Sequence, residues 1–128
     1  MRGKHETVGI NRVYGFYDQV KRRYSTKLWK TFIEPMESLP FAAVIDDMIF
    51  CVNSGLSPHM ETLYQIQSIK RPISVPDGGI LFHFLYTKPD DDAIGWEDDG
   101  NSNDQLYFGP DVTSDFLNKH GFTLMILS

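Results

Sequence analysis

Two short apolar runs joined by a polar pair near the middle of the chain predict a β-hairpin. Residues 43–45 and 48–52 are rich in β-branched and bulky apolar side chains, which favour strands. Asp46 and Asp47 form a two-residue connection, although without the glycine that gives a hairpin turn its strongest signal. Neither run alternates between polar and apolar positions, so we expect other elements to cover both faces. The hairpin is the expected centre of the fold.

Helical periodicity flanks this hairpin on both sides. Residues 10–24 have apolar side chains at helical spacing and predict one amphipathic helix. A second helix is expected from about Thr26. It should kink or end near Glu34, because an interior proline, here Pro35, costs about 3 kcal/mol and removes a hydrogen bond. After the hairpin, residues 59–69 predict a short third helix that stops before a proline.

The second half of the chain alternates apolar and acidic stretches. Residues 80–86 are a dense apolar run, for which we favour a short buried helix although periodicity alone leaves a strand open. Residues 88–104 predict a solvated loop with Trp96 as its large apolar anchor. A helix over residues 110–119 and a strand over residues 122–127 complete the chain. The expected class is α/β.

The acidic loop also raises the alternative of a calcium site. Its carboxylate and amide side chains are of the type that binds Ca²⁺, but their spacing does not fit the EF-hand template. We therefore favour the solvated loop. The candidate ligands of the alternative are Asp98, Asp99, Asn101, Asn103 and Asp104.

Composition places the chain among ordinary globular proteins. Its 128 residues suffice for one domain, and 41% are hydrophobic and 23% charged. No apolar run reaches the roughly 18 residues of a membrane span, and the N-terminus has no apolar signal core, so we expect no membrane partner. The lone Cys51 excludes an intramolecular disulfide and agrees with a reducing compartment. A cytoplasmic or nuclear location is expected.

The net charge of −5 is unevenly spread along the chain. Residues 1–30 carry eight Lys and Arg against two acids, whereas residues 31–128 carry four basic and fifteen acidic side chains. A phosphate or nucleic-acid site is conceivable in the basic part, but we favour a solvated helix end whose cations lie near the C-terminal dipole. We expect no nucleic-acid partner, since the domain is not basic. The cluster comprises Lys21, Arg22, Arg23, Lys27 and Lys30.

Residue chemistry alone assigns no function. The loop of Asn53, Ser54 and Gly55 follows an expected buried strand, where an α/β protein can carry a catalytic loop, but this is also ordinary scaffolding. No second cysteine is present and the histidines form no metal-ligand pattern, so a zinc site has no support. The histidines are His5, His59, His83 and His120.

Longer motifs carry a resemblance. They are Met-Arg-Gly-Lys-His-Glu at 1–6, Ile-Asn-Arg-Val-Tyr-Gly-Phe-Tyr-Asp at 10–18, Lys-Arg-Arg-Tyr at 21–24, Lys-Leu-Trp-Lys-Thr-Phe at 27–32, Phe-Cys-Val-Asn-Ser-Gly-Leu-Ser-Pro at 50–58 and Arg-Pro-Ile-Ser-Val-Pro-Asp at 71–77. Together they resemble the catalytic core of the metal-dependent serine/threonine protein phosphatases, most closely the type-1 branch. The resemblance implies a partial calcineurin-like metallophosphoesterase fold over residues 1–128, a fragment of a β-sandwich flanked by helices. The family's two preceding Asp-containing metal motifs and its following Arg-Ala-His segment have no counterpart.

The family's chemistry uses two divalent metal ions, of the Mn, Fe or Zn type, to activate a water and clamp the phosphate, while a histidine protonates the leaving oxygen. In its Arg-Gly-Asn-His-Glu motif the Asn is a metal ligand and the His is the acid. In this sequence His5 keeps the acid position, but Lys4 replaces the ligand, and a charged ammonium has no lone pair to donate. Asn53 replaces the ligand His of the family's His-Gly-Gly loop. Weak or no metal binding is implied.

Other matched positions concern the substrate. The family's Leu-Trp-Ser-Asp-Pro becomes Leu-Tyr-Thr-Lys-Pro at residues 85–89, and its phosphate-binding Arg falls near Ser102. The resemblance implies a phosphoprotein substrate or regulatory subunits as partners. The positions that resemble the family's substrate groove are Ile10, Tyr14 and Tyr86.

Three functional hypotheses follow. An active phosphatase is disfavoured, because metal Lewis acidity supplies most of the rate and the ligands are replaced. A pseudophosphatase or interaction module would keep surfaces without chemistry. A truncated or decayed gene copy without a selected role is favoured by the start at Met1, where the family has Leu before Arg-Gly. We expect a family member that is catalytically impaired, with the last two hypotheses as alternatives.

Overall fold

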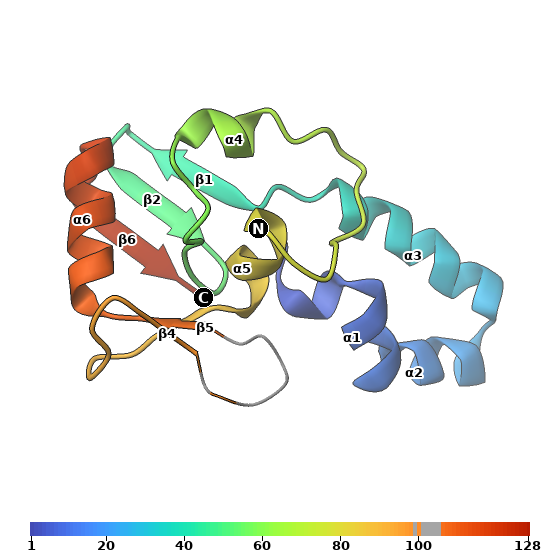
Figure 1. Ribbon diagram of the computed structural model, residues 1–128. Helices are drawn as coiled ribbons and strands as arrows, with labels where there is room; N and C mark the ends of the chain where they lie inside the picture. The colour runs from blue at the N-terminus through green and yellow to red at the C-terminus, as the bar shows by residue number, and fades with distance from the viewer. Residues whose placement is uncertain (99, 101–105) are drawn as a thin grey trace.

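The computed structural model describes residues 1–98, 100 and 106–128. Helices α1 to α3 lie at one end of the molecule and α6 at the other, with a three-stranded sheet between them (Figure 1). The class is α/β, as expected. The elements in chain order are η1 (Lys4–Glu6), α1 (Val8–Val13), α2 (Phe16–Arg23), α3 (Thr26–Ser38), β1 (Ala42–Ile45), β2 (Ile49–Val52), α4 (Leu63–Gln67), α5 (Ile80–Tyr86), β3 (Lys88–Pro89), β4 (Trp96–Asp98), β5 (Leu106–Phe108), α6 (Pro110–His120) and β6 (Leu124–Leu127).

The predicted hairpin is confirmed. Strands β1 and β2 pair antiparallel with Ile45 opposite Ile49, and β6 adds to β2 in parallel. Asp46 and Asp47 have φ values of 51° and 54°. Two successive residues in the left-handed region give the turn whose twist matches that of the paired strands. Aspartate tolerates this conformation, so the turn forms without glycine.

One face of this sheet is open, so the expectation that both faces are covered is wrong. Ile45 is 52% exposed and Leu124 is 48% exposed, whereas Phe50 and Val52 are buried. Side chains alternate between the two faces of a strand, and these two sets belong to opposite faces. The apolar runs therefore identified the strand residues, but they did not show which face of the sheet is covered.

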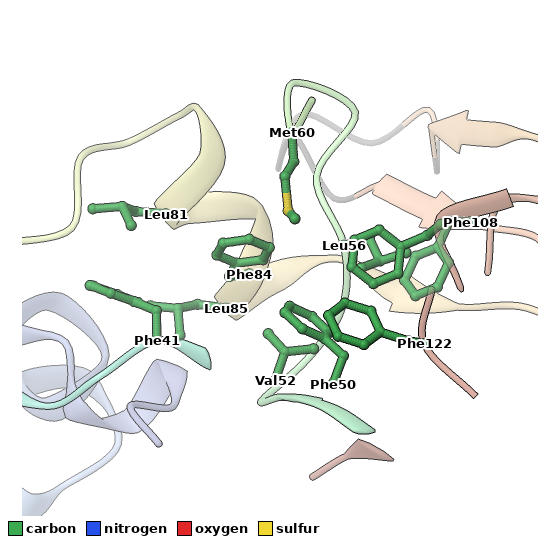
Figure 2. Close-up of a cluster of buried hydrophobic side chains, with 11 residues drawn as sticks. Phe41, Phe50, Val52, Leu56, Met60, Leu81, Phe84, Leu85, Phe108 and Phe122 are labelled. Carbon is green, nitrogen blue, oxygen red and sulfur yellow. The ribbon is translucent and has the colours of Figure 1, made fainter. Parts of the chain in front are cut away.

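The core lies on the inner face of the sheet and is largely aromatic. Phe50 stacks on Phe122 at 5.5 Å between ring centroids (Figure 2). Both rings also pack against Phe116 of α6. Phe84 and Leu85 of α5 are fully buried in the same cluster. Residues 80–86 are thus a buried helix, which settles the choice left open between helix and strand.

The first expected helix is divided into two. Helix α1 ends at Val13 and α2 begins at Phe16, so a single helix over residues 10–24 is wrong. Gly15 at the junction has a φ of 93°, a left-handed conformation that ends a right-handed helix. Apolar periodicity continues across the break although Val13 at the end of α1 is 80% exposed, so the pattern does not reveal the junction.

Helix α3 continues through Pro35, so of the two outcomes expected there an end near Glu34 is wrong, and a kink stays a prediction. Trp29, on the N-terminal side of the proline, is 2% exposed, and Met36 directly after it is half-buried. Burying such side chains contributes about 1.5–3 kcal/mol each, which offsets the roughly 3 kcal/mol cost of an interior proline.

Helix α4 is shorter than the helix expected over residues 59–69. The Gln65 side chain accepts hydrogen bonds from the backbone N–H groups of Glu61 and Thr62, at 2.7 and 2.9 Å, and this fixes the start of the helix after Thr62. Apolar spacing does not reveal a boundary that such side-chain bonds impose.

Part of the expected acidic loop forms a second sheet. Strand β5 pairs in parallel with β3 and antiparallel with β4, so an entirely irregular segment over residues 88–104 is wrong. Trp96 packs against Phe108 at 5.6 Å between ring centroids, which confirms its role as an anchor. The described residues do not include the following predicted positions: Asp99, Asn101, Ser102, Asn103 and Asp104.

The last two elements agree closely with the sequence. Helix α6 begins at Pro110 and is closed by Gly121 in a left-handed conformation, with φ of 73°. Strand β6 then pairs beside β2. Within the described part of the chain, no helix is both long and apolar enough to cross a membrane.

Candidate functional site

The N-terminal segment that carries the predicted acid and ligand positions is held by Arg2. This side chain is fully buried; its guanidinium donates to the Ile73 and Glu6 carbonyls and lies 5.5 Å from the centroid of the Phe41 ring. Burial lowers the pKa of Arg2, and the charges of Glu37 and Glu6 oppose this. Arg2 therefore fixes the backbone from which the next residues project.

Gly3 brings this segment against the loop after β2. A Cβ at Gly3 would lie 3.0 Å from the amide nitrogen of Asn53 and 2.9 Å from a carboxylate oxygen of Glu6. That oxygen accepts the backbone N–H of Gly3 at 2.8 Å. Since a side chain at this position would meet both groups, glycine is needed for the close approach.

A cavity of about 400 Å³ opens where these two segments meet. Lys4, Lys88 and Glu6 lie on its wall, and the Glu6 carboxylate keeps its negative charge while it accepts the backbone N–H of Gly3. Two lysines against one acid give the lining side chains a net positive charge, and we call this the cationic cavity. Its lining residues are Gly3, Lys4, His5, Glu6, Asn53, Ser54, Lys88, Pro89, Leu127 and Ser128.

The structure brings together three of the predicted site residues. Lys4, His5 and Asn53 all line the cationic cavity, as their motif positions imply. Their proposed roles stay predictions. Ser54 follows Asn53 in the same loop, and its hydroxyl donates to the Leu85 carbonyl at 2.9 Å, which joins the loop to α5.

None of the three predicted groove residues lines this cavity. The Tyr14 ring meets His5 edge-on at 5.3 Å between centroids, and both line a second cavity of about 230 Å³. The Tyr86 hydroxyl lies 3.5 Å from the Thr7 hydroxyl. Ile10 is half-buried on α1. Their part in substrate binding remains a prediction.

Asn11 is a buried residue whose side chain hydrogen-bonds to two segments, and the sequence did not single it out. Its side-chain oxygen accepts the indole N–H of Trp29 at 2.5 Å, and its amide nitrogen donates to the His5 carbonyl at 3.3 Å. It is 3% exposed. The His5 backbone is thereby joined to α3, and a lone Asn within a helical pattern gives no signal for this role.

Lys88 is the cavity residue that sequence reasoning missed. It stands where the resembled family has Asp in its Leu-Trp-Ser-Asp-Pro segment, so a charge reversal was visible in the sequence. That Lys88 lies on the same cavity as Lys4 was not visible in the sequence, because 84 positions separate the two residues (88 − 4 = 84). Strand β3 places it at the mouth of the cavity.

The cationic cavity does not fit a divalent metal ion. Metal ligands need lone pairs, whereas protonated lysines have none to offer. Among the described residues, no three His, Cys, Asp or Glu side chains are grouped so that they could hold a metal. The donor set instead suits an anion.

Comparisons with known proteins place this geometry in a family. The model of the calcineurin-like phosphoesterases matches residues 1–128. The chain belongs to this family. Members use divalent metal ions, and the lysines of the cationic cavity do not suit such ions.

Among solved structures, this chain is similar to a protein serine/threonine phosphatase from Saccharomyces cerevisiae that is described as similar to human phosphatase PP5. The sequences are 29% identical and the TM-score is 0.86. The match covers 98% of this chain but 39% of the yeast chain, so this chain spans well under half of that neighbour. The partial calcineurin-like fold is thereby confirmed.

Proposed function

We propose that this chain is a catalytically impaired relative of the serine/threonine protein phosphatases that binds phosphomonoesters in the cationic cavity without hydrolysing them. The observation that carries the proposal is the pairing of Lys4 and Lys88 on one cavity beside His5. Phosphoserine or phosphothreonine in a protein is the expected ligand class. A location in the cytoplasm or nucleus is part of the proposal and rests on the reduced Cys51.

Phosphate binding follows from the charges. Lysine is a capable point-charge partner for phosphate, and charge-assisted hydrogen bonds are about twice as strong as neutral ones. The amide of Asn53 adds a donor on the same wall. Lys88 is exposed, so part of this attraction is screened by salt and weak, salt-sensitive binding is expected.

Hydrolysis is not expected of these residues. Attack on phosphorus needs an activated water, and a protonated amine does not lower the pKa of water as bound metal cations do. His5 lines the cavity and keeps the position of the family's acid, but a leaving-group acid without a nucleophile gives no turnover. The cavity is therefore expected to bind a phosphomonoester without hydrolysing it.

The test titrates the chain with a phosphoserine peptide and its unphosphorylated twin in low salt. Lys4→Ala and Lys88→Ala should each weaken phosphopeptide binding about tenfold, equivalent to about 1.4 kcal/mol. Lys119→Ala, on the exposed side of α6, is the matched control and should change nothing. Equal affinities for all four proteins, or for the two peptides, would remove the proposal.

Phosphate release measured with added Mn²⁺ separates the alternatives. Turnover by the original chain would favour an active phosphatase and contradict the proposal. No turnover is expected from the double variant Lys4→Asn, Asn53→His, because the two substitutions do not by themselves create a cluster of metal ligands. A chain that binds neither peptide would favour a decayed copy without a selected role.

A further inference from the structure

Strand β1 has a free edge. It pairs with β2 on one side, and within the described part of the chain no strand pairs with its other side. Ala43, Val44 and Ile45 are all exposed. An unpaired edge presents backbone N–H and C=O groups to other chains, and proteins commonly block it with charged side chains or proline. Every residue of β1 is apolar, so its sequence does not block the edge.

A cavity of about 200 Å³ lies beside this edge, between β1 and α4. Helix α4 lies next to β1, on the side of the sheet away from β6 (Figure 1). Ala42 and Val44 reach the cavity from the face of the sheet that also carries Phe50. We call this cavity the β1–α4 groove. Its lining residues are Ala42, Ala43, Val44, Phe50, Leu63, Ile66 and Gln67.

The edge and the groove together favour an extended peptide as the occupant. The free backbone groups of β1 need backbone partners, which an added strand supplies, whereas a helix pairs its own backbone groups internally. Side chains of a strand alternate between its two faces, so every second side chain of an added strand would point to the face of Phe50 and reach the groove. Apolar side chains suit these positions, because the lining side chains are uncharged and mainly apolar.

Charges at the ends of β1 orient such a strand. Neither β1 nor α4 contains a charged residue, and the acids that flank them most closely in sequence are Asp46 and Asp47, directly after β1, and Glu61, before α4. All three are exposed. At the start of β1, where Arg71 donates to the Ser38 carbonyl at 3.0 Å, acids and bases balance. The charged residues there are Glu34, Glu37, Lys70 and Arg71.

We propose that the β1–α4 groove binds an extended segment of another protein, which adds to β1 as an antiparallel strand. Basic residues of the segment lie beside Asp46 and Asp47, and apolar side chains enter the groove. Strand addition of this kind takes its affinity from main-chain hydrogen bonds and its specificity from pockets for alternate side chains, and antiparallel pairing is slightly more stable than parallel. The site does not depend on phosphate binding, since the groove and the cationic cavity share no lining residue.

The probe is a fluorescent synthetic peptide, Lys-Lys-Val-Thr-Val-Thr-Val, whose binding to the full chain is measured by anisotropy. One twin is N-methylated at the central Val and the other at the Thr before it, so each loses a backbone donor from a different edge of the peptide strand. One twin should bind about tenfold more weakly, and the other should bind within about twofold of the parent. No binding by the parent, or equal effects of the two methyl groups, would overturn the proposal.

Two matched substitutions locate the site. Val44 on β1 is 44% exposed, and Ile126 on the opposite edge strand β6 is 43% exposed. Val44→Glu should weaken binding at least about tenfold, because a carboxylate is costly to bury beneath the added strand. Ile126→Glu adds the same charge and should not weaken binding. Stronger or unchanged binding by Val44→Glu would overturn the proposal. Urea denaturation checks that both variants fold, and the two methylated peptides decide if Val44→Glu does not.

The double variant Asp46→Asn, Asp47→Asn tests the orientation. Asparagine tolerates the left-handed backbone of this turn, so the hairpin is retained. The peptide should bind about threefold more weakly, since exposed charge pairs contribute little. A peptide with Ser-Ser in place of Lys-Lys should lose a similar factor against the original chain and nothing further against the variant. Unchanged binding of the basic peptide by the variant would overturn the proposed orientation.

A second copy of this chain is the rival occupant. Backbone amide shifts on adding the peptide should cluster in β1 and α4, and shifts confined to other elements would overturn the proposal. Sedimentation of the chain alone provides the comparison. Dimers that Val44→Glu abolishes, together with no binding of the peptide, would overturn the proposal in favour of pairing between two β1 edges.

Discussion

His83 shows how a single buried side chain can couple stability to pH. Its Nδ1 lies 2.8 Å from the Ser57 hydroxyl, and it is 7% exposed. The His59 ring is 5.2 Å away, centroid to centroid. Burial lowers the pKa of His83 from its ordinary value of 6.5, and the charge of His59 lowers it further. The folded chain therefore resists protonation at this site.

The consequence is acid sensitivity. Below about pH 6.5 the unfolded chain binds a proton at His83 while the folded chain does not, so stability falls as the pH drops through this window and is unaffected above it. His83→Gln keeps a hydrogen-bonding group beside Ser57 but cannot titrate. Urea denaturation at several pH values between 5 and 7.5 should show a smaller loss for the variant. An identical pH dependence in both proteins would contradict this assignment.

At the residue scale, motif substitutions were informative and isolated residues were not. Lys4, His5 and Asn53 could be placed together because each stands in a recognisable motif, and the structure joins them on one cavity. Arg2 and Asn11 also stand in the quoted motifs, but the motifs did not reveal their buried roles. These roles come from hydrogen bonds across the fold, to Ile73, Glu6, Trp29 and His5. Chemistry that depends on long-range partners is not readable from local pattern.

At the element scale, the junction of α1 and α2 offers a matched pair of glycines. Gly15 has a φ of 93°, whereas Gly9 lies within α1 with open space around its Cα and no left-handed backbone. Gly15→Ala should destabilise the chain by about 1–2 kcal/mol, because a side chain is disfavoured in the left-handed region. Gly9→Ala should stabilise it by about 0.5–1 kcal/mol. Urea midpoints that shift in the same direction for both variants would show that the left-handed backbone of Gly15 does not cause the helix break.

Apolar periodicity predicted which helices and strands exist more reliably than it predicted the residues at which they begin and end. The hairpin, α5 and α6 were predicted within a residue or two, since their apolar runs and turn residues agree. The break at Gly15, the passage through Pro35 and the late start of α4 were not predicted. At Pro35 tertiary packing decided the outcome and at the start of α4 a side-chain hydrogen bond did, whereas the left-handed backbone of Gly15 sets the break between α1 and α2. Strands β3 and β4 were not predicted, because their composition does not favour strands and they form through pairing with β5.

At the scale of the whole molecule, the sheet has an apolar outer face. Ile45 of β1 and Leu124 of β6 lie on either side of Ile49 in the same register row, and Ile126 is 43% exposed on the same face. The sheet order β1-β2-β6 makes β1 and β6 edge strands within the described residues. Exposed apolar patches and unpaired strand edges both promote association. We therefore expect the isolated chain to self-associate through this face.

Leu124→Lys tests this expectation at one end of the exposed row, on the edge strand β6. A charge there opposes burial against a second molecule, since an unpaired ammonium is costly to desolvate. Light scattering coupled to size-exclusion chromatography should show a lower apparent mass for the variant at equal concentration. Asn118→Lys adds the same charge on an exposed position of α6 and should leave the mass distribution of the original chain unchanged. If both variants reduce association equally, net charge is responsible, and if the original chain is monodisperse and monomeric over the whole concentration range, the outer face of the sheet does not drive association.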